Sequence, residues 1–519
     1  MDQYAKQALQ ECNSAEATPH RGGVDGRPFW NVKSTQFMFA PYLQFPKGPA
    51  GCSYRFTVKD QNGAVHTLHG ADSAVSLAPV WGAMPEGFVK LTAEAVDAAG
   101  SLQVVGEREI YKCAPFPGRK SYPPKARSYR ECARKAFRFV FEDSMVQHWL
   151  LHGVPDPDYA HNAYPCKMID SIITAMVYYA ELEPENAENA IKLACRAADY
   201  LLSITPEGDH PLAGLPPTYS FEGLHGESVD KVAPAARRCL GTTMMIYPIT
   251  AGRSLLTLAE ATGEEKYFKA SLRIGEYYKK TMLPCGSWYL VLDCETGEPK
   301  TENKCIEFKI IEFFHALHQK TGDEGWLEPA QAHFNYILEN CLKNYNWEGQ
   351  FEDIRVSDHY NNLTHFGADA MIQHIAAHLA HDEAMVKEAE ELMRFVEDQF
   401  VLWGKYPNWN GKTDIKPYYT PAGLEQYYCY SPIDGSTAVI MDTFLTMYQL
   451  KKDRLYLEKA MTLGDTITRR QVEETGMIPT FWTGVNCEYG HVNFWINCQI
   501  GTAFCMMKLA EATEAEGVE

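Results

Sequence analysis

The sequence predicts a mainly α-helical protein, an (α/α)6 toroid of six helical hairpins that follows a small N-terminal antiparallel β-sandwich. Two observations predict this fold. Apolar residues recur with period two from Phe29 to about Phe116, and beyond about Ser128 they recur with the period of helices. The chain has 519 residues, 45% of them hydrophobic, which allows several domains at roughly 150 residues each.

The β-sandwich is predicted from alternation along two stretches. In residues 54–59 the apolar Tyr54, Phe56 and Val58 alternate with polar side chains, which indicates a half-buried strand. Asn62-Gly63 follows, a dipeptide that favours a type I′ hairpin turn. Residues 89–95 alternate in the same way and lead through a turn into a further strand.

Residues 115–124 contain four prolines, which interrupt both the hydrogen bonding between β-strands and the hydrogen bonding of a helix. We therefore expect a sandwich domain with its leading segment at residues 1–117, a proline-rich linker at 118–127, and the toroid as the catalytic domain at 128–519.

The helices of the second region are predicted to come in pairs. Short polar separators, such as those after Thr262 and Thr321, suit tight links between antiparallel helices. The last helix, residues 495–509, has almost no charge, which suits an inner helix of a closed ring better than the polar cap of an open array. An irregular helical array is the alternative. The predicted inner helices begin near positions 163, 240, 303, 361, 432 and 495, and their partners begin near 128, 185, 265, 324, 383 and 453.

Composition limits the function classes. The formal net charge is −19, which repels nucleic-acid backbones and anionic lipid surfaces, so we expect neither as a partner. The start of the chain lacks the apolar core of a secretory signal, which favours a cytoplasmic protein. The 15 cysteines form no CxxC pair, and we expect them to be mostly reduced and buried. The sandwich could serve a homodimer contact.

The long links that lead into the inner helices are expected at one end of the ring, and they are rich in aromatic residues and carboxylates. Aromatic faces and polar side chains suit a sugar. Hydrolysis of a glycoside needs a carboxylic acid and a second carboxylate. The catalytic candidates are Asp434, Glu222, Glu307 and Asp369, although Asp434 could equally cap the helix that it precedes.

Histidines and an arginine in the same links could hold an anionic saccharide. The candidates for substrate binding are His225, Arg355, His359, His365, Tyr428, Glu425, Trp482 and His491. His374 and His378 are four residues apart, but Ile375 stands where a zinc-protease helix needs glutamate. We expect neither a metal nor another cofactor. No GxSxG, P-loop or GxGxxG pattern occurs.

Three segments carry a resemblance to a known family. They are FWNVKSTQFMFAP at residues 29–41, NNLTHFG at 361–367 and LEQYYCYSPIDGS at 424–436. The layout resembles (α/α)6-toroid carbohydrate enzymes, and these segments resemble gut-bacterial β-glucuronidases of glycoside hydrolase family 154. The resemblance implies an exo-acting hydrolase that removes terminal glucuronic acid from glycans or conjugates without a metal. The expected absence of a secretory signal peptide differs from relatives that act in the periplasm, and a removed signal would make this protein periplasmic or secreted.

Three function classes stay open. The first is a β-glucuronidase-like glycoside hydrolase that uses two carboxylates of the links on a uronide. The second is a polysaccharide lyase or C5 epimerase on the same fold, in which His365 and Tyr360 or Tyr428 handle the C5 proton of a uronate. The third is a non-catalytic glycan-binding protein, which would not need so many titratable groups in one set of links.

Overall fold

A computed structural model describes residues 2–15, 34–232, 234–351, 363–404, 418–426, 431–482 and 495–518. The chain forms two compact units. Unit 1 consists of Met1–Ala126, Leu363–Arg469 and Phe481–Glu488, and unit 2 consists of Arg127–Asn362, Arg470–Thr480 and Tyr489–Glu519. The helical region is thus shared between the two units, and the predicted division at residues 118–127 stays a prediction.

The β-region of unit 1 is a five-stranded sheet with the order β1-β7-β6-β3-β4, beside a small sheet of β2 and β5. The strands are β1 (Gln36–Phe37), β2 (Tyr42–Gln44), β3 (Ser53–Lys59), β4 (Val65–Gly70), β5 (Ala74–Ser76), β6 (Gly87–Val96) and β7 (Leu102–Lys112). Phe56 and Leu91 are buried while their neighbours along the strands are not, which confirms the period-two prediction. One pairing differs from the prediction, because β1 runs parallel to β7.

The hairpin between β3 and β4 forms where predicted, but its turn is not type I′. That turn needs positive φ at both central residues, and here Gly63 has a φ of 84° while Asn62 stays outside the left-handed region. The reason lies in Asp60, whose Oδ1 accepts hydrogen bonds from the backbone N–H of Asn62 and Ala64, both at 2.9 Å. This side chain supports a longer loop.

Unit 1 also contains helices, some of which lie far along the sequence from the sheet. They are α1 (Gln3–Ser14), α3 (Ala78–Trp81), α14 (Phe366–His378), α15 (Glu383–Phe400), α16 (Asp434–Lys451) and α17 (Arg454–Arg470). The sequence did not predict α1, which Asp2 caps and which buries Ala5, Ala8 and Cys12. Asp398 of α15 joins the two parts of the unit, because its Oδ1 accepts hydrogen bonds from the backbone N–H of Phe39 at 2.8 Å and of Met38.

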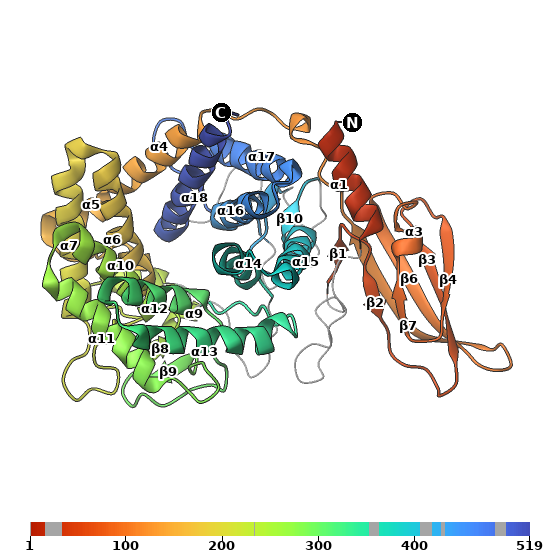
Figure 1. The fold of residues 1–519 in the computed structure, drawn as a ribbon, viewed down its shortest axis with the longest axis horizontal. Coiled ribbons are helices and arrows are strands. Elements are labelled where there is room, and N and C mark those ends of the chain that lie inside the picture. The colour runs from red at the N-terminus through yellow and green to blue at the C-terminus, as the bar shows by residue number, and fades with distance from the viewer. Residues whose placement is uncertain are drawn as a thin grey trace. The chain divides into compact units, whose positions relative to one another are not determined.

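Unit 2 is a helical array (Figure 1). Its helices are α4 (Tyr129–Glu142), α5 (Ser144–His152), α6 (Pro165–Leu182), α7 (Ala187–Ser203), α8 (Gly226–Lys231), α9 (Pro234–Arg238), α10 (Pro248–Thr262), α11 (Glu265–Thr281), α12 (Phe308–Thr321), α13 (Leu327–Ile337) and α18 (Ile496–Ala515). Helices α18, α6, α10 and α12 pack in series, and their outer partners are α4, α7, α11 and α13 in the same order. The C-terminal helix α18 therefore packs against α4 and α6, which lie at the start of the helical region.

The predicted helical pairs are confirmed at their links. Gly263 and Gly322 end α10 and α12 with φ angles of 73° and 71°, a left-handed conformation that glycine adopts without strain. The inner helices begin close to the predicted positions except α10, which begins eight residues late. Residues 242–244 form β8 (Thr242–Met244) instead, paired with β9 (Val291–Asp293), and Pro248 then starts the helix.

The protein is mainly helical, as predicted, while closure into a complete toroid stays a prediction. None of the described helices is long and apolar enough to cross a membrane.

Candidate active site

The best-supported candidate site lies in unit 1, at the N-terminal ends of α14 and α16. These two helices pack against each other. The segments that lead into them are tied by isolated bridges: Thr364 pairs with Gln426, Leu424 with Pro432, and Ile433 with Phe481. Strands β10 (Val401–Leu402) and β11 (Ala422–Gly423) extend this network. We call the residues that begin α14 and α16, with these segments, the unit 1 mouth.

His365 and Asp369 form a buried pair at this mouth. They are four residues apart, which brings their side chains together on one face of a helix. His365 Nδ1 is hydrogen-bonded to Asp369 Oδ2, and the two side chains are 0% and 1% exposed. An ionised carboxylate only accepts, so Nδ1 carries the proton and Nε2 is left as the acceptor. This is the relationship between a catalytic base and the residue that orients it.

Two atoms of this pair have unfilled hydrogen-bonding positions. In the described part of the chain, neither His365 Nε2 nor Asp369 Oδ1 has a hydrogen-bond partner, and both atoms are buried. Buried polar atoms in proteins are nearly always satisfied. A ligand hydroxyl, which can donate to an acceptor atom, is the kind of group that would fill such positions.

Asp434 begins the neighbouring helix α16, with its side chain 0% exposed. The sequence left a capping role open, but the N-cap position belongs to Ile433, and Asp434 is the first helical residue. A carboxylate there still benefits from the partial positive charge of the helix N-terminus. His365 and Asp434 therefore begin two packed helices, and the structure brings both predicted residues to one mouth.

Two further predicted residues lie at the same mouth. Glu425 is half-buried, and its Oε2 accepts a hydrogen bond from Gln426 Nε2 at 3.1 Å. Trp482 is 0% exposed, and its backbone N–H donates to the carbonyl of Pro432 at 2.9 Å. This burial favours packing of the mouth as the role of Trp482 over direct contact with a ligand.

Three predicted residues lie in unit 2. Glu307 is the N-cap of α12, where its Oε1 accepts from the backbone N–H of Lys309 at 3.2 Å. This N-cap hydrogen bond accounts for the presence of a carboxylate at position 307, so a catalytic role is not needed to explain it. Glu222 is exposed on a loop, and His225 is the N-cap residue of α8, with its Nδ1 3.6 Å from Asp158 Oδ1. Arg355, His359, Tyr428 and His491, together with Tyr360 of the lyase alternative, lie outside the described residues.

Sequence reasoning missed a buried carboxyl group on α6. Asp170 is 6% exposed, and burial raises its pKa to about 7, against the opposing effects of a hydrogen bond with Thr250 and of nearby Lys309. A carboxyl group with this pKa can donate or accept a proton at neutral pH. A signal existed in the sequence, because Asp170 interrupts an apolar helix whose buried residues include Ile169 and Ile172.

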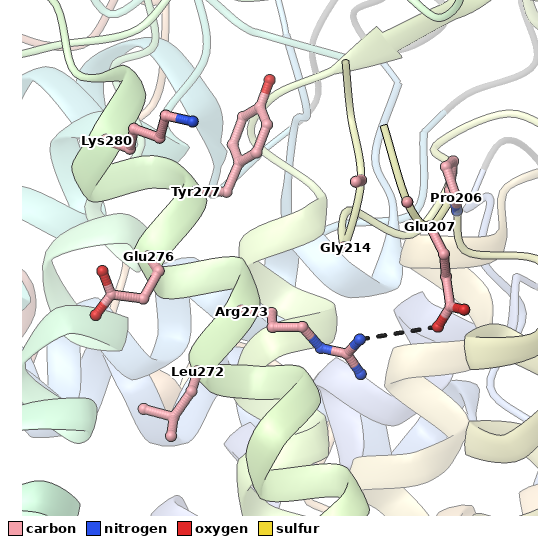
Figure 2. A pocket seen from close by; sticks show the side chains of 10 residues that line it. Pro206, Glu207, Gly214, Leu272, Arg273, Glu276, Tyr277 and Lys280 are labelled. Atoms are coloured by element: carbon pink, nitrogen blue, oxygen red, sulfur yellow. Dashed lines mark ion pairs between the residues drawn. The ribbon is translucent and has the colours of Figure 1, made fainter. Parts of the chain in front are cut away.

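A hollow of about 690 Å³ lies elsewhere on unit 2, between the outer helix α11 and residues 206–214 (Figure 2). Arg273 and Glu207 form an ion pair of 3.8 Å across it, and Tyr277 and Lys280 also line it. None of the predicted site residues lines this hollow. It is wide open and lies on the outer layer, so we favour the unit 1 mouth as the candidate active site.

Comparison with known proteins supports the fold. No family model and no curated protein matches the chain. Among solved structures it is similar to cellobiose 2-epimerase from Spirochaeta thermophila DSM 6192, with 12% identity over 74% of this chain and 98% of that chain and a TM-score of 0.51. It is also similar to a D-mannose isomerase, with 10% identity over 76% of this chain and 100% of that chain and a TM-score of 0.51. At these identities the likeness is one of fold.

Proposed function

We propose that this chain is a carbohydrate-active enzyme, specifically a β-glucuronidase-like glycoside hydrolase that releases terminal uronic acid from glycans or conjugates. The observation that carries the proposal is the gathering of His365, Asp369 and Asp434, three buried titratable side chains, where α14 and α16 begin. The sugars named in the two fold neighbours, and the resemblance of residues 361–367 and 424–436 to glycoside hydrolase family 154, support a saccharide substrate.

Each group has a proposed role. Asp434 and Glu425 are the two carboxylates of the reaction, one protonating the leaving oxygen and the other activating water or attacking the sugar. His365, held by Asp369, binds the substrate through Nε2. Arg355, His359, Tyr428 and His491 stay predicted contacts of the uronate. Glu307 is assigned to capping, so it leaves the catalytic set of this proposal.

A panel of chromogenic glycosides tests the proposal. It compares p-nitrophenyl β-glucuronide with the matching glucoside, galactoside and mannoside. We expect release of nitrophenol from the glucuronide and at least tenfold less from the neutral sugars, because a charge-assisted contact to the carboxylate is worth roughly 1.5–3 kcal/mol. Binding of glucuronic acid without turnover of any glycoside would contradict the hydrolase and favour a glycan-binding protein.

A second function is favoured by the His365–Asp369 pair, since an oriented imidazole suits abstraction of the C5 proton of a uronate. The chain would then be a lyase or a C5 epimerase. A lyase yields an unsaturated product that absorbs in the ultraviolet. An epimerase incorporates deuterium at C5 in heavy water without cleaving the chain. Neither signal is expected from a hydrolase, so the two measurements separate the candidates.

A further inference from the structure

The inner helices of unit 2 carry charges on one exposed stripe each. On α10, Arg253 is exposed while the residues on both sides of it are buried. In the first two turns of α12 the exposed residues are Lys309 and Glu312, and on α18 Lys508 is exposed. The outer helices α11, α13 and α4 pack against the buried faces of the same three helices. The exposed stripes therefore face the inside of the array.

Glu312 indicates that these stripes line a concave surface of unit 2. Its side chain is exposed to water, yet burial raises its pKa, which fits a group that lines a concave surface rather than the outside of the molecule. Lys309, Arg253 and Lys508 oppose this rise. These three residues come from different helices, α12, α10 and α18. In the packing series α18 is separated from α12 by α6 and α10.

The charge on these stripes is opposite to that of the protein as a whole. Three cationic side chains act on Glu312 against one further carboxylate, Glu307, in a chain with a net charge of −19. Asp170 contributes little negative charge, because its pKa is raised to about 7 by burial. Further along α10, Glu260 pairs with Lys320 of α12 at 3.5 Å.

An aromatic ring lies beside the same helices. Trp495, the N-cap residue of α18, is partly exposed, and Lys167 Nζ lies 5.1 Å from the centre of its ring. The ring of His161 lies 3.9 Å from that of Trp495. Aromatic rings next to cations suit a ligand that has both sugar C–H groups and a negative charge.

We propose that Arg253, Lys309 and Lys508 form a binding site for the negatively charged group of an acidic saccharide. The identity of the ligand as a saccharide rests on the proposed function, whereas the preference for an anion follows from the charges on α10, α12 and α18. Arg253 can bind a carboxylate or sulfate with two parallel hydrogen bonds, and the lysines add charge. No step of the reaction is assigned to these residues.

Calorimetric titration tests the site with three probes: D-glucuronic acid, D-glucose 6-sulfate and D-glucose. We expect the wild-type protein to bind at least one of the two acidic sugars about tenfold or more tightly than glucose. The double variant Arg253→Gln/Lys309→Gln should lose most of this preference, and Lys508→Gln should lose part of it. A stronger response to glucuronate than to the sulfate identifies a carboxylate as the natural charge. The opposite order identifies a sulfate ester.

A matched control is Lys269→Gln on the outer helix α11, which removes the same charge from an exposed pair with Glu265. It should bind all three probes as the wild type does. Circular dichroism verifies that each variant is folded. The site would be overturned if the wild type bound neither acidic sugar more tightly than glucose, or if the folded double variant kept an unchanged preference.

The test separates this site from the proposed function. If the wild type hydrolyses p-nitrophenyl β-glucuronide and the folded double variant keeps the wild-type preference for acidic sugars in calorimetry, the site is wrong and the hydrolase stands. If no glycoside is hydrolysed but the charge preference is present and lost in the double variant, the site stands and the hydrolase is wrong.

Discussion

His365 Nδ1 is hydrogen-bonded to Oδ2 of Asp369, one turn further along α14, with both side chains buried. This pair fixes the tautomer of the imidazole and leaves Nε2 as an acceptor at the mouth of unit 1. Four predictions concern this site, a helix cap, and buried charged groups elsewhere in the chain.

Replacing Asp369 should weaken substrate binding without unfolding the protein. In Asp369→Asn the carboxamide can donate to His365 Nδ1 and stabilise the tautomer whose Nε2 carries the proton. Nε2 then no longer accepts a hydrogen bond from the substrate, so we expect KM to rise about tenfold. Steady-state kinetics of wild type and variant, on the glycoside of the panel that the wild type hydrolyses fastest, measure this change. The control is Asp442→Asn, the same change further along α16, where Gln373 donates to the carboxylate at 3.3 Å. A similar rise in KM in both variants would contradict the assigned role.

Asp434 and Glu307 should respond in opposite ways. Asp434→Asn is expected to lower kcat by orders of magnitude and leave a folded protein. Glu307→Ala removes an N-cap and should lower the free energy of unfolding by about 1 kcal/mol with activity nearly intact. Urea denaturation and kinetics on the same samples test both. A catalytic loss in Glu307→Gln, which keeps a capping oxygen, would return Glu307 to the catalytic set.

Asp170 should make the protein less stable as the pH rises. Its pKa is raised from 3.8 in the unfolded chain to about 7 by burial, so between these values the folded state holds a proton that the unfolded state has lost. Stability is therefore lost as pH rises from about 4 to about 7. Asp170→Asn removes this loss, so its melting temperature relative to wild type should rise from about pH 4 to about pH 7 and level off above that.

The groups that face Asp170 do not reverse this sign. Lys309 of α12 and the hydrogen bonds with Thr250 and Ser171 favour ionisation, but burial outweighs them. The control is Asp230→Asn on α8, an exposed carboxylate 3.7 Å from Arg237. If the melting-temperature difference between Asp170→Asn and wild type stays constant across this pH range, Asp170 is ionised throughout and the prediction is wrong.

A buried ion pair in unit 1 should show strong coupling. Lys459 Nζ lies 2.7 Å from Glu397 Oε2, with side chains 2% and 4% exposed, and Trp403 Nε1 donates to the other carboxylate oxygen at 2.9 Å. Lys459→Met leaves Glu397 as an uncompensated buried charge and should cost about 3–5 kcal/mol. The double variant with Glu397→Gln should recover much of that loss in urea denaturation. If the loss of unfolding free energy in the double variant equals the sum of the losses in the two single variants, the coupling is contradicted.

Much of the helical region was predictable because its signals are local. Helical periodicity and the separators at Gly263 and Gly322 indicated where most of the helices begin and which ones pair, since a short polar link with a left-handed glycine favours a hairpin. The buried strands β3 and β6 were predictable for the same reason. The turn at Asn62 was predicted wrongly, because the Asp60 side chain takes part in the loop.

The sequence by itself determined that the fold is mainly helical, and it named the candidates that the structure places at the unit 1 mouth. His365, Asp369, Asp434 and Glu425 all come from segments that lead into or begin α14 and α16. The sequence could not separate a cap from a catalytic group, because Glu307 and Asp434 both stand at helix starts, and only the folded backbone assigns the cap to one of them. Tertiary structure alone decided the environment of Asp170 and the gathering of Arg253, Lys309 and Lys508. Burial and electrostatic interaction depend on distances between helices that are far apart in the chain, and no local pattern encodes those distances.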